Sequence, residues 1–164
     1  MKIRVLKKFQ LFIHMPFKDQ LLFLVAFILS GIARALIITV PLKRYQPYIG
    51  IPNEDSPHKN ICLQDWQTIK RIRHLSLLAC KYTPWESKCL VRALVVSWIL
   101  KYYNIPTTLY LGVAKDKTLL AHAWLRCGPY IITGGDVQRN FVEVAKFSNY
   151  SLINRERSWE NHVL

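Results

Sequence analysis

Cys89 is the residue in this sequence that is best placed to act as a nucleophile. It follows a loop that contains Pro84, and the apolar run that begins at Cys89 predicts a helix over residues 89–103. A thiol at the start of a helix lies near the positive end of the helix dipole, which favours the thiolate. The first N–H groups of a helix also lack intrahelical partners, so they could stabilise the oxyanion of a tetrahedral intermediate.

A thiol nucleophile needs a base, and His122 is the candidate for that role. It lies in a predicted strand over residues 120–126, which can pack against the helix that begins at Cys89. An acidic residue should then orient the imidazole and hold its tautomer. Asp136 follows the next predicted strand and is the first choice, with Glu143 as the fallback. We therefore hypothesise a Cys-His-Asp hydrolase.

Each member of this set also has a purely structural explanation. Cys89 could be a buried helix cysteine, and His122 could be a core histidine bonded to a carbonyl. Asp136 follows two glycines, a position that suits an aspartate in a turn. A zinc site from Cys89, His122 and Cys127 lacks the paired short spacings of structural zinc, so no metal and no cofactor are expected.

Three further residues lie close in sequence to the candidate nucleophile and base. Trp85 and Trp124 could line a substrate cleft, although packing in the core is the usual role of a tryptophan. Arg92, one turn after the nucleophile, could bind substrate or form a structural ion pair. Both interpretations stay open for all three.

The elements that would position these residues predict an α+β fold. Apolar residues at helical spacing predict a helix from about Leu63 to Lys81, ahead of the helix that carries the nucleophile. Short β-forming runs separated by turns then predict strands at residues 107–113, 120–126 and 130–133. N-terminal helices are thus followed by a nucleophile-bearing helix packed on a small antiparallel sheet.

The N-terminal part differs from the rest in composition. We expect an apolar helical segment with a Pro-rich linker at residues 1–58 and the catalytic domain at residues 59–164. The run from Leu21 to Val40 is long enough to span a membrane, but Arg34 lies inside it. A helix of the protein core is the first interpretation. An interfacial helix on a membrane or partner is the second, and a true span the third.

The net charge of +13 comes from 23 Lys and Arg against 10 Asp and Glu. Such a surplus suits an acidic peptide, an anionic membrane or a nucleic acid. No nucleic-acid-binding motif is present, so we expect no nucleic-acid partner. The basic start is not followed by a cleavage site, and we expect a cytoplasmic protein with free thiols, with peripheral membrane contact as an addition.

Several short motifs occur together at a characteristic separation. They are Pro84-Trp85, Cys89-Leu90-Val91-Arg92-Ala93-Leu94, Ile105-Pro106, Leu111-Gly112-Val113 and Ala121-His122-Ala123-Trp124. Over about residues 60–145 the chain resembles the leader peptidases of lasso-peptide biosynthesis, which belong to the transglutaminase-like, papain-related cysteine proteases.

The resemblance implies a transglutaminase-like core with Cys89 as nucleophile, His122 as base and Asp136 as the third member. It implies removal of the leader from a ribosomally made precursor peptide, which exposes the core α-amine for macrolactam formation. The implied partners are the precursor, a separate leader-recognition protein and a macrolactam cyclase. Two alternatives stay open, namely an acyltransferase or amidase with the same triad and a non-enzymatic, membrane-docked scaffold.

Overall fold

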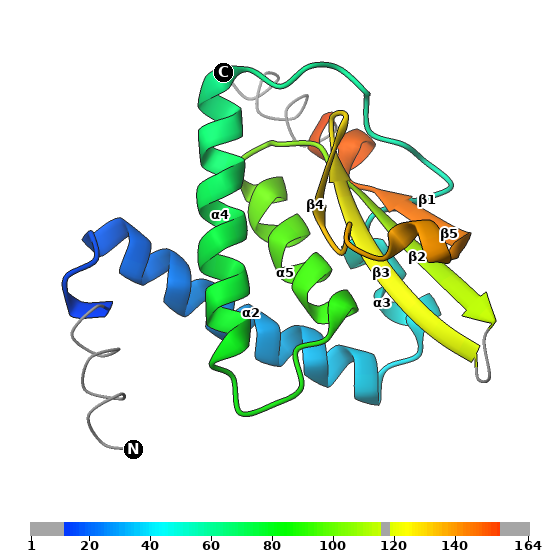
Figure 1. Ribbon diagram of the computed structural model, residues 1–164, viewed down its shortest axis with the longest axis horizontal. Helices are drawn as coiled ribbons and strands as arrows, with labels where there is room; N and C mark the ends of the chain where they lie inside the picture. Colours follow the sequence, from blue (N-terminus) through cyan, green and yellow to red (C-terminus); the bar gives the residue numbers. More distant parts are fainter. Residues whose placement is uncertain (1–11, 116–118, 155–164) are drawn as a thin grey trace, which may run out of the picture.

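A computed structural model describes residues 12–115 and 119–154 of the 164-residue chain. The predicted α+β fold is confirmed, with helices along the first two thirds of the chain and most strands after them (Figure 1). The helices are α2 (Phe17–Thr39), α3 (Leu42–Ile49), α4 (Leu63–Lys81) and α5 (Cys89–Tyr102). The strands are β1 (Ile51–Pro52), β2 (Thr108–Lys115), β3 (Leu119–Cys127), β4 (Tyr130–Thr133) and β5 (Val142–Ser148), and the 3-10 helix η1 (Gln138–Asn140) precedes β5.

The strands form one antiparallel sheet in the order β1-β5-β2-β3-β4. The three predicted strands are β2, β3 and β4, and they follow one another as the expected meander. Strands β1 and β5, which are not part of the predicted meander, extend the sheet on the other side of β2. The two-residue β1 exists only through its pairing with β5, where Ile51 lies opposite Ser148, so its own sequence carries no strand pattern.

The central helix of the molecule is α5, which lies between the sheet and the α2–α4 pair (Figure 1). Its position explains why it is apolar nearly all round rather than on one stripe. Its buried residues are Val91, Ala93, Leu94, Val95, Val96, Ser97, Ile99 and Leu100. The helix predicted over residues 89–103 is confirmed to within one residue.

Helix α4 has the predicted bounds and packs its apolar stripe against α5 and α2. Ile69, Ile72 and Leu75 are buried on that stripe. The other side of α4 reaches the sheet edge, where Arg73 Nε donates a hydrogen bond of 2.6 Å to the carbonyl of Ile132 in β4. Helix α4 therefore supports both α5 and the strand that precedes the predicted acid.

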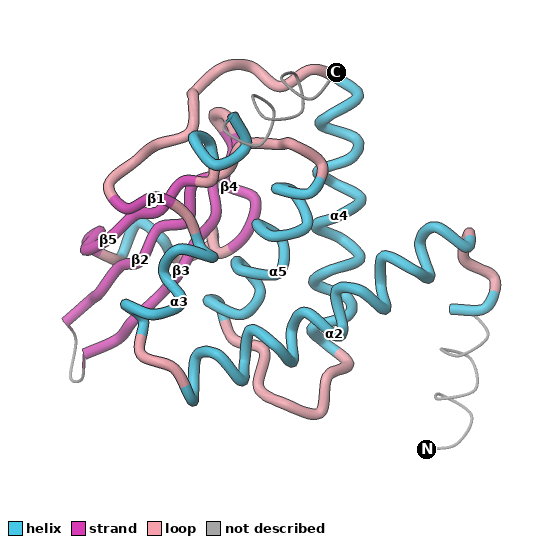
Figure 2. Tube along the Cα trace, turned by 180° about the vertical axis from the view of Figure 1, so that it is seen from behind, coloured by secondary structure: helices cyan, strands magenta, loops and turns pink. Residues whose placement is uncertain are grey.

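Helix α2 crosses α4 and α5 on the side away from the sheet (Figures 1 and 2). It adds Leu22, Ala26 and Ala33 to the same core cluster that α5 and the sheet form. The boundary drawn between residues 58 and 59 stays a prediction. Residues 42–52, which belong to the expected Pro-rich segment before that boundary, form α3 and β1.

The linker prediction rested on prolines, and the structure shows why they do not prevent a helix here. Pro41 is the N-cap of α3, and Pro47 lies inside this short helix. Tyr45 and Ile49 are buried, so tertiary packing outweighs the low helix propensity of the segment.

Candidate functional site

Cys89 is the first residue of α5 and is partly exposed, as the sequence predicts for a nucleophile. The N-cap residue Lys88 makes no side-chain cap hydrogen bond. The first intrahelical donor of this turn is the Arg92 N–H, which bonds the Lys88 carbonyl at 3.1 Å. The backbone N–H groups before Arg92 therefore have no partner within the helix and are available to an oxyanion.

The loop that leads into Cys89 is held from both sides. Trp85 Nε1 donates a hydrogen bond of 3.1 Å to Ser30 Oγ on α2. On the other side, Arg92 Nε donates a 2.7 Å hydrogen bond to the Ser87 carbonyl. Trp85 thus packs against α2, and Arg92 bonds a backbone carbonyl rather than a carboxylate. The substrate-binding roles considered for both residues stay predictions.

The four cysteines differ sharply in their surroundings. Burial raises the pKa of Cys80, and it raises the pKa of Cys127 to about 12. A thiol with such a pKa carries almost no thiolate at neutral pH and is a poor nucleophile. Cys62 is exposed at the N-cap of α4, where its Sγ accepts a hydrogen bond from the Asp65 N–H at 3.4 Å. The two accessible thiols are therefore Cys62 and Cys89.

His122 lies in β3, on a strand that packs against α5. Its Nε2 lies 2.9 Å from the carbonyl oxygen of Gly134, just after β4. A carbonyl only accepts hydrogen bonds, so this contact requires the proton on Nε2. In the neutral ring, Nδ1 is then the unprotonated nitrogen that can accept a proton.

Gly134 suits this contact because no other residue fits its position. Its backbone has φ of 72°, in the region that favours glycine. A Cβ at Gly134 would lie 2.5 Å from the Ala123 carbonyl oxygen and 3.0 Å from His122 Nε2. The hydrogen bond to the imidazole therefore depends on a glycine.

Two aromatic rings pack against the imidazole. The ring centroid of Phe141 lies 4.9 Å from that of His122, and the centroid of Trp124 lies 6.2 Å away. Trp124 is buried and stacks on Tyr110 of β2 at 5.6 Å. Gly112 leaves the space for this packing, because a Cβ there would lie 2.6 Å from the Trp124 ring. A substrate-contacting role for Trp124 stays a prediction, while its packing under His122 is observed.

Asp136 is exposed in the turn after Gly134. Within the described residues, no hydrogen bond or ion pair joins its carboxylate to the imidazole. The fallback, Glu143, lies opposite Gly112, which itself lies opposite His122. Two strand spacings place the Glu143 backbone about 10 Å from that of His122. The group that the structure places at Nε2 is the Gly134 carbonyl, and the role of Asp136 stays a prediction.

Cys89 and His122 lie on two elements that pack together, α5 and β3. Side chains alternate along a strand, so His122 shares a face of β3 with Trp124, while Leu125, which joins α5 in the core, lies on the opposite face. No hydrogen bond between the Cys89 thiol and the His122 ring occurs in the described part of the chain, and such bonds are often long until substrate binds. A thiol at an open helix start and an imidazole of defined tautomer suit nucleophilic attack on a carbonyl. The residues that the structure describes include no His, Cys, Asp and Glu group that could hold a metal ion.

Comparison with protein families agrees with this arrangement. The model of the transglutaminase-like superfamily matches residues 33–146, most of the chain. The chain belongs to the transglutaminase-like superfamily. Among curated proteins and among solved structures, no significant match is found.

Membership places this transglutaminase-like protein among enzymes of the cysteine-protease and acyltransferase type. The match begins within α2 and ends within β5, so it includes Cys89, His122 and Asp136. From the sequence, Gly134 and Gly135 indicate only a turn before Asp136, and nothing there marks the Gly134 carbonyl as the partner of the His122 ring.

Proposed function

We propose that this chain is a cysteine endopeptidase that removes the leader from a ribosomally made lasso-peptide precursor. The chemistry is supported by family membership and by the hydrogen bond that leaves Nδ1 of His122 free to act as a base. The choice of substrate is supported by the Cys-Leu-Val-Arg-Ala-Leu and Ala-His-Ala-Trp motifs around Cys89 and His122. The surplus of positive charge would also attract an acidic peptide to the chain.

The proposed reaction has two steps. Nδ1 of His122 takes the thiol proton of Cys89, and the thiolate attacks the carbonyl carbon of the scissile bond. The open N–H groups at the start of α5 stabilise the oxyanion. The imidazolium then gives its proton to the departing amine, which leaves as the core peptide with a free α-amine. Water attacks the remaining thioester with His122 again as base, which releases the leader.

The three predicted triad members have different support within this proposal. Cys89 and His122 carry the covalent and proton-transfer steps. The Gly134 carbonyl holds the tautomer through Nε2, the position at which the family resemblance expects Asp136. The Asp136 carboxylate would add a negative charge near the imidazolium from two residues further along the chain. The macrolactam cyclase is proposed as the partner that consumes the core peptide.

The test is leader release followed by mass spectrometry. The full chain is incubated with a leader-recognition protein and a precursor peptide encoded in the same gene neighbourhood. We expect Cys89→Ala to abolish cleavage, while Cys62→Ser retains it. Cys62 is the matched control because it is also a cysteine at a helix start, and serine is a good N-cap residue.

Two results would contradict the proposal. Cleavage by Cys89→Ala at the parent rate would exclude Cys89 as the nucleophile. An amide product that forms only when a primary amine is added, with no hydrolysis in its absence, would identify the chain as an acyltransferase that uses the same thioester.

A further inference from the structure

Helix α2 carries a long row of apolar side chains that face solvent. From the first residue to Ile32 most of them recur at spacings of three or four and therefore share one helix face, and Ile38 follows six positions later. At 1.5 Å per residue, the row extends for about 30 Å. We call it the α2 stripe, and it consists of Phe17, Leu21, Leu24, Val25, Ile28, Ile32 and Ile38, which are 40–77% exposed.

The opposite face of α2 is attached to the domain. Ala26, Ser30 and Ala33 are fully buried there. Two polar contacts add to this packing, because Ser30 accepts the Trp85 hydrogen bond and Arg34 forms an ion pair of 3.1 Å with Glu86. The helix cannot turn its stripe inward without breaking them, so the outward direction of the stripe is part of the fold.

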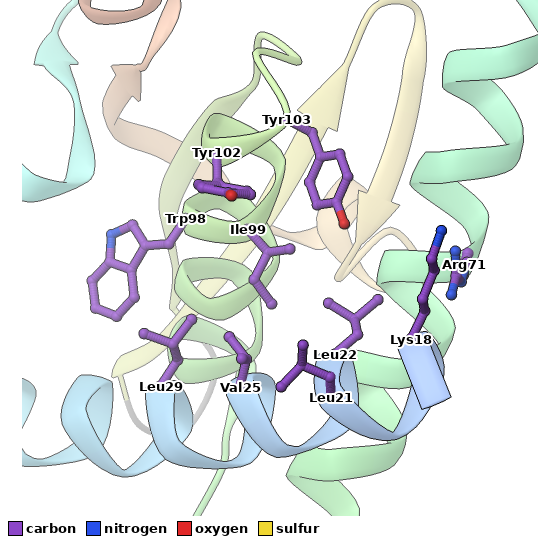
Figure 3. Close-up of a pocket in the computed structure, with 10 residues that line it drawn as sticks. All are labelled: Lys18, Leu21, Leu22, Val25, Leu29, Arg71, Trp98, Ile99, Tyr102 and Tyr103. Carbon is purple, nitrogen blue, oxygen red and sulfur yellow. The ribbon is translucent and has the colours of Figure 1, made fainter. Parts of the chain in front are cut away.

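A cavity of about 560 Å³ adjoins the N-terminal half of the stripe (Figure 3). Leu21 and Val25 belong to both the stripe and the cavity, and aromatic side chains of α5 face them. Lys18 and Arg71 lie together at one end of the cavity in Figure 3. The residues of α5 and its C-cap that line it are Trp98, Ile99, Tyr102 and Tyr103.

Positive charge lies at both ends of the stripe. Lys18 is exposed beside its first residues, and Lys43 and Arg44 are exposed at the start of α3, five and six residues after Ile38. The net charge of the chain is +13. An apolar helix face flanked by Lys and Arg, with Trp and Tyr beside it, is typical of helices that lie in the interface of an anionic membrane.

By length and composition, α2 also qualifies as a membrane span, as some core helices and signal sequences do. In the described structure, however, one side of α2 packs on α4 and α5. Lipid can therefore reach only the stripe side, which is the geometry of a helix lying flat on a membrane surface.

We propose that the α2 stripe docks this protein on the surface of a membrane that contains anionic lipid. Phe17, Ile28 and their neighbours in the stripe enter the headgroup region. Lys18, Lys43 and Arg44 contact anionic headgroups. Because Trp85 packs on the opposite face of α2, docking leaves the loop before Cys89 on the side of the helix that faces away from the membrane.

The test is partition of the full chain onto vesicles, measured by flotation. Ile28→Glu places a charge in the middle of the stripe and should lower the partition coefficient on phosphatidylcholine–phosphatidylglycerol vesicles at least tenfold. Val144→Glu is the matched control, since Val144 lies on β5 and both side chains are 59% exposed. We expect that control to bind like the parent, and circular dichroism to show the same thermal unfolding for all three proteins.

The same vesicle-binding measurement is repeated with a different lipid composition and with more salt. Binding should weaken at least tenfold on pure phosphatidylcholine, and again when the NaCl concentration is raised from 0.1 M to 0.5 M, because salt screens headgroup contacts (about 8–10 Å Debye length near 0.1 M). Absence of binding to anionic vesicles would overturn the proposal, as would equal binding of Ile28→Glu and the parent. A dimer in solution that Ile28→Glu dissociates would show instead that a second copy covers the stripe. None of these results depends on peptidase activity.

Discussion

At the scale of single residues, the imidazole of His122 is oriented by a backbone carbonyl and by two aromatic rings. The Gly134 carbonyl bonds Nε2, and Phe141 and Trp124 pack against the ring. A backbone carbonyl holds the tautomer without placing a charge beside the ring. Substitutions at Gly134, which supplies this carbonyl, and at Asp136, which supplies a carboxylate, should therefore have separable effects on catalysis.

The first prediction concerns these two positions. Gly134→Ala should lower kcat of leader removal at least tenfold, because its Cβ would lie 3.0 Å from His122 Nε2 and displace the ring. Asp136→Asn should lower kcat by less, since the hydrogen bond to the carbonyl remains. Steady-state kinetics of both variants checks this. A larger loss for Asp136→Asn would show that its carboxylate is the orienting group, as the family resemblance expects.

The second prediction concerns thiol reactivity. Iodoacetamide should modify Cys62 and Cys89 in the native protein and leave Cys80 and Cys127 unmodified, because burial raises the pKa of both buried thiols. His122→Gln should slow the modification of Cys89 at least tenfold and leave the rate at Cys62 unchanged. Peptide mapping by mass spectrometry gives both rates. An unchanged rate at Cys89 would mean that His122 does not act on its thiol.

At the scale of elements, α2 supports the loop that carries the nucleophile. The Trp85 ring lies 5.2 Å from the ring of Phe27, and its Nε1 bonds Ser30. Gly31 allows this approach, because a Cβ there would lie 3.0 Å from the Trp85 ring. The start of α5 is thus tied to α2 as well as to its own helix.

The third prediction tests this support. Trp85→Phe keeps an aromatic ring but removes the donor to Ser30, so the free energy of unfolding should fall by about 1 kcal/mol. Trp66→Phe is the control, since Trp66 packs against Tyr130 with ring centroids 4.7 Å apart and the described residues include no hydrogen-bond partner for its indole. Urea denaturation measures both. If both variants lose the same free energy of unfolding, the loss in Trp85→Phe comes from the smaller ring and not from the missing hydrogen bond.

At the scale of the whole molecule, an ionic cluster joins the segment after β1 to the sheet. The buried Arg126 side chain donates to Asp55 Oδ1 at 3.1 Å and to the carbonyls of Ser56 and Gly128. Asp55 also accepts hydrogen bonds from Tyr110 and Lys146. Burial raises the pKa of Asp55, but the bonds from Lys146, Tyr110 and Arg126 outweigh it and lower the pKa to about 2.

The fourth prediction follows from this pKa. The unfolded value is 3.8, so the stabilisation by Asp55 is fully present above about pH 4 and is lost as the pH falls toward 2. Asp55→Asn should cost about 1–3 kcal/mol at pH 7, because Arg126 loses a charged acceptor. Differential scanning calorimetry should show the Tm difference from the parent narrowing between pH 5 and pH 2.5. A Tm difference that stays constant over this pH range would mean that ionisation of Asp55 does not cause the stabilisation.

The sequence by itself determined the features that depend on local patterns. The bounds of α4, the start of α5 and the three strands of the meander follow from apolar spacing and from turn residues such as Pro84. Cys89 could be singled out because a position at a helix start is a local property. The direction of the exposed face of α2 was left open, since an apolar run of that length fits a core helix first, an interfacial helix second and, because of Arg34, a span last.

Only the tertiary structure decided which distant groups meet. The pairing of β1 with β5, the carbonyl of Gly134 at the imidazole and the burial of one side of α2 all join segments far apart in the chain. Backbone carbonyls are present in every residue, so no residue type marks the one that orients His122. Likewise, the α2 stripe faces outward because Trp85 and Glu86 hold the opposite side, a contact that no local pattern encodes.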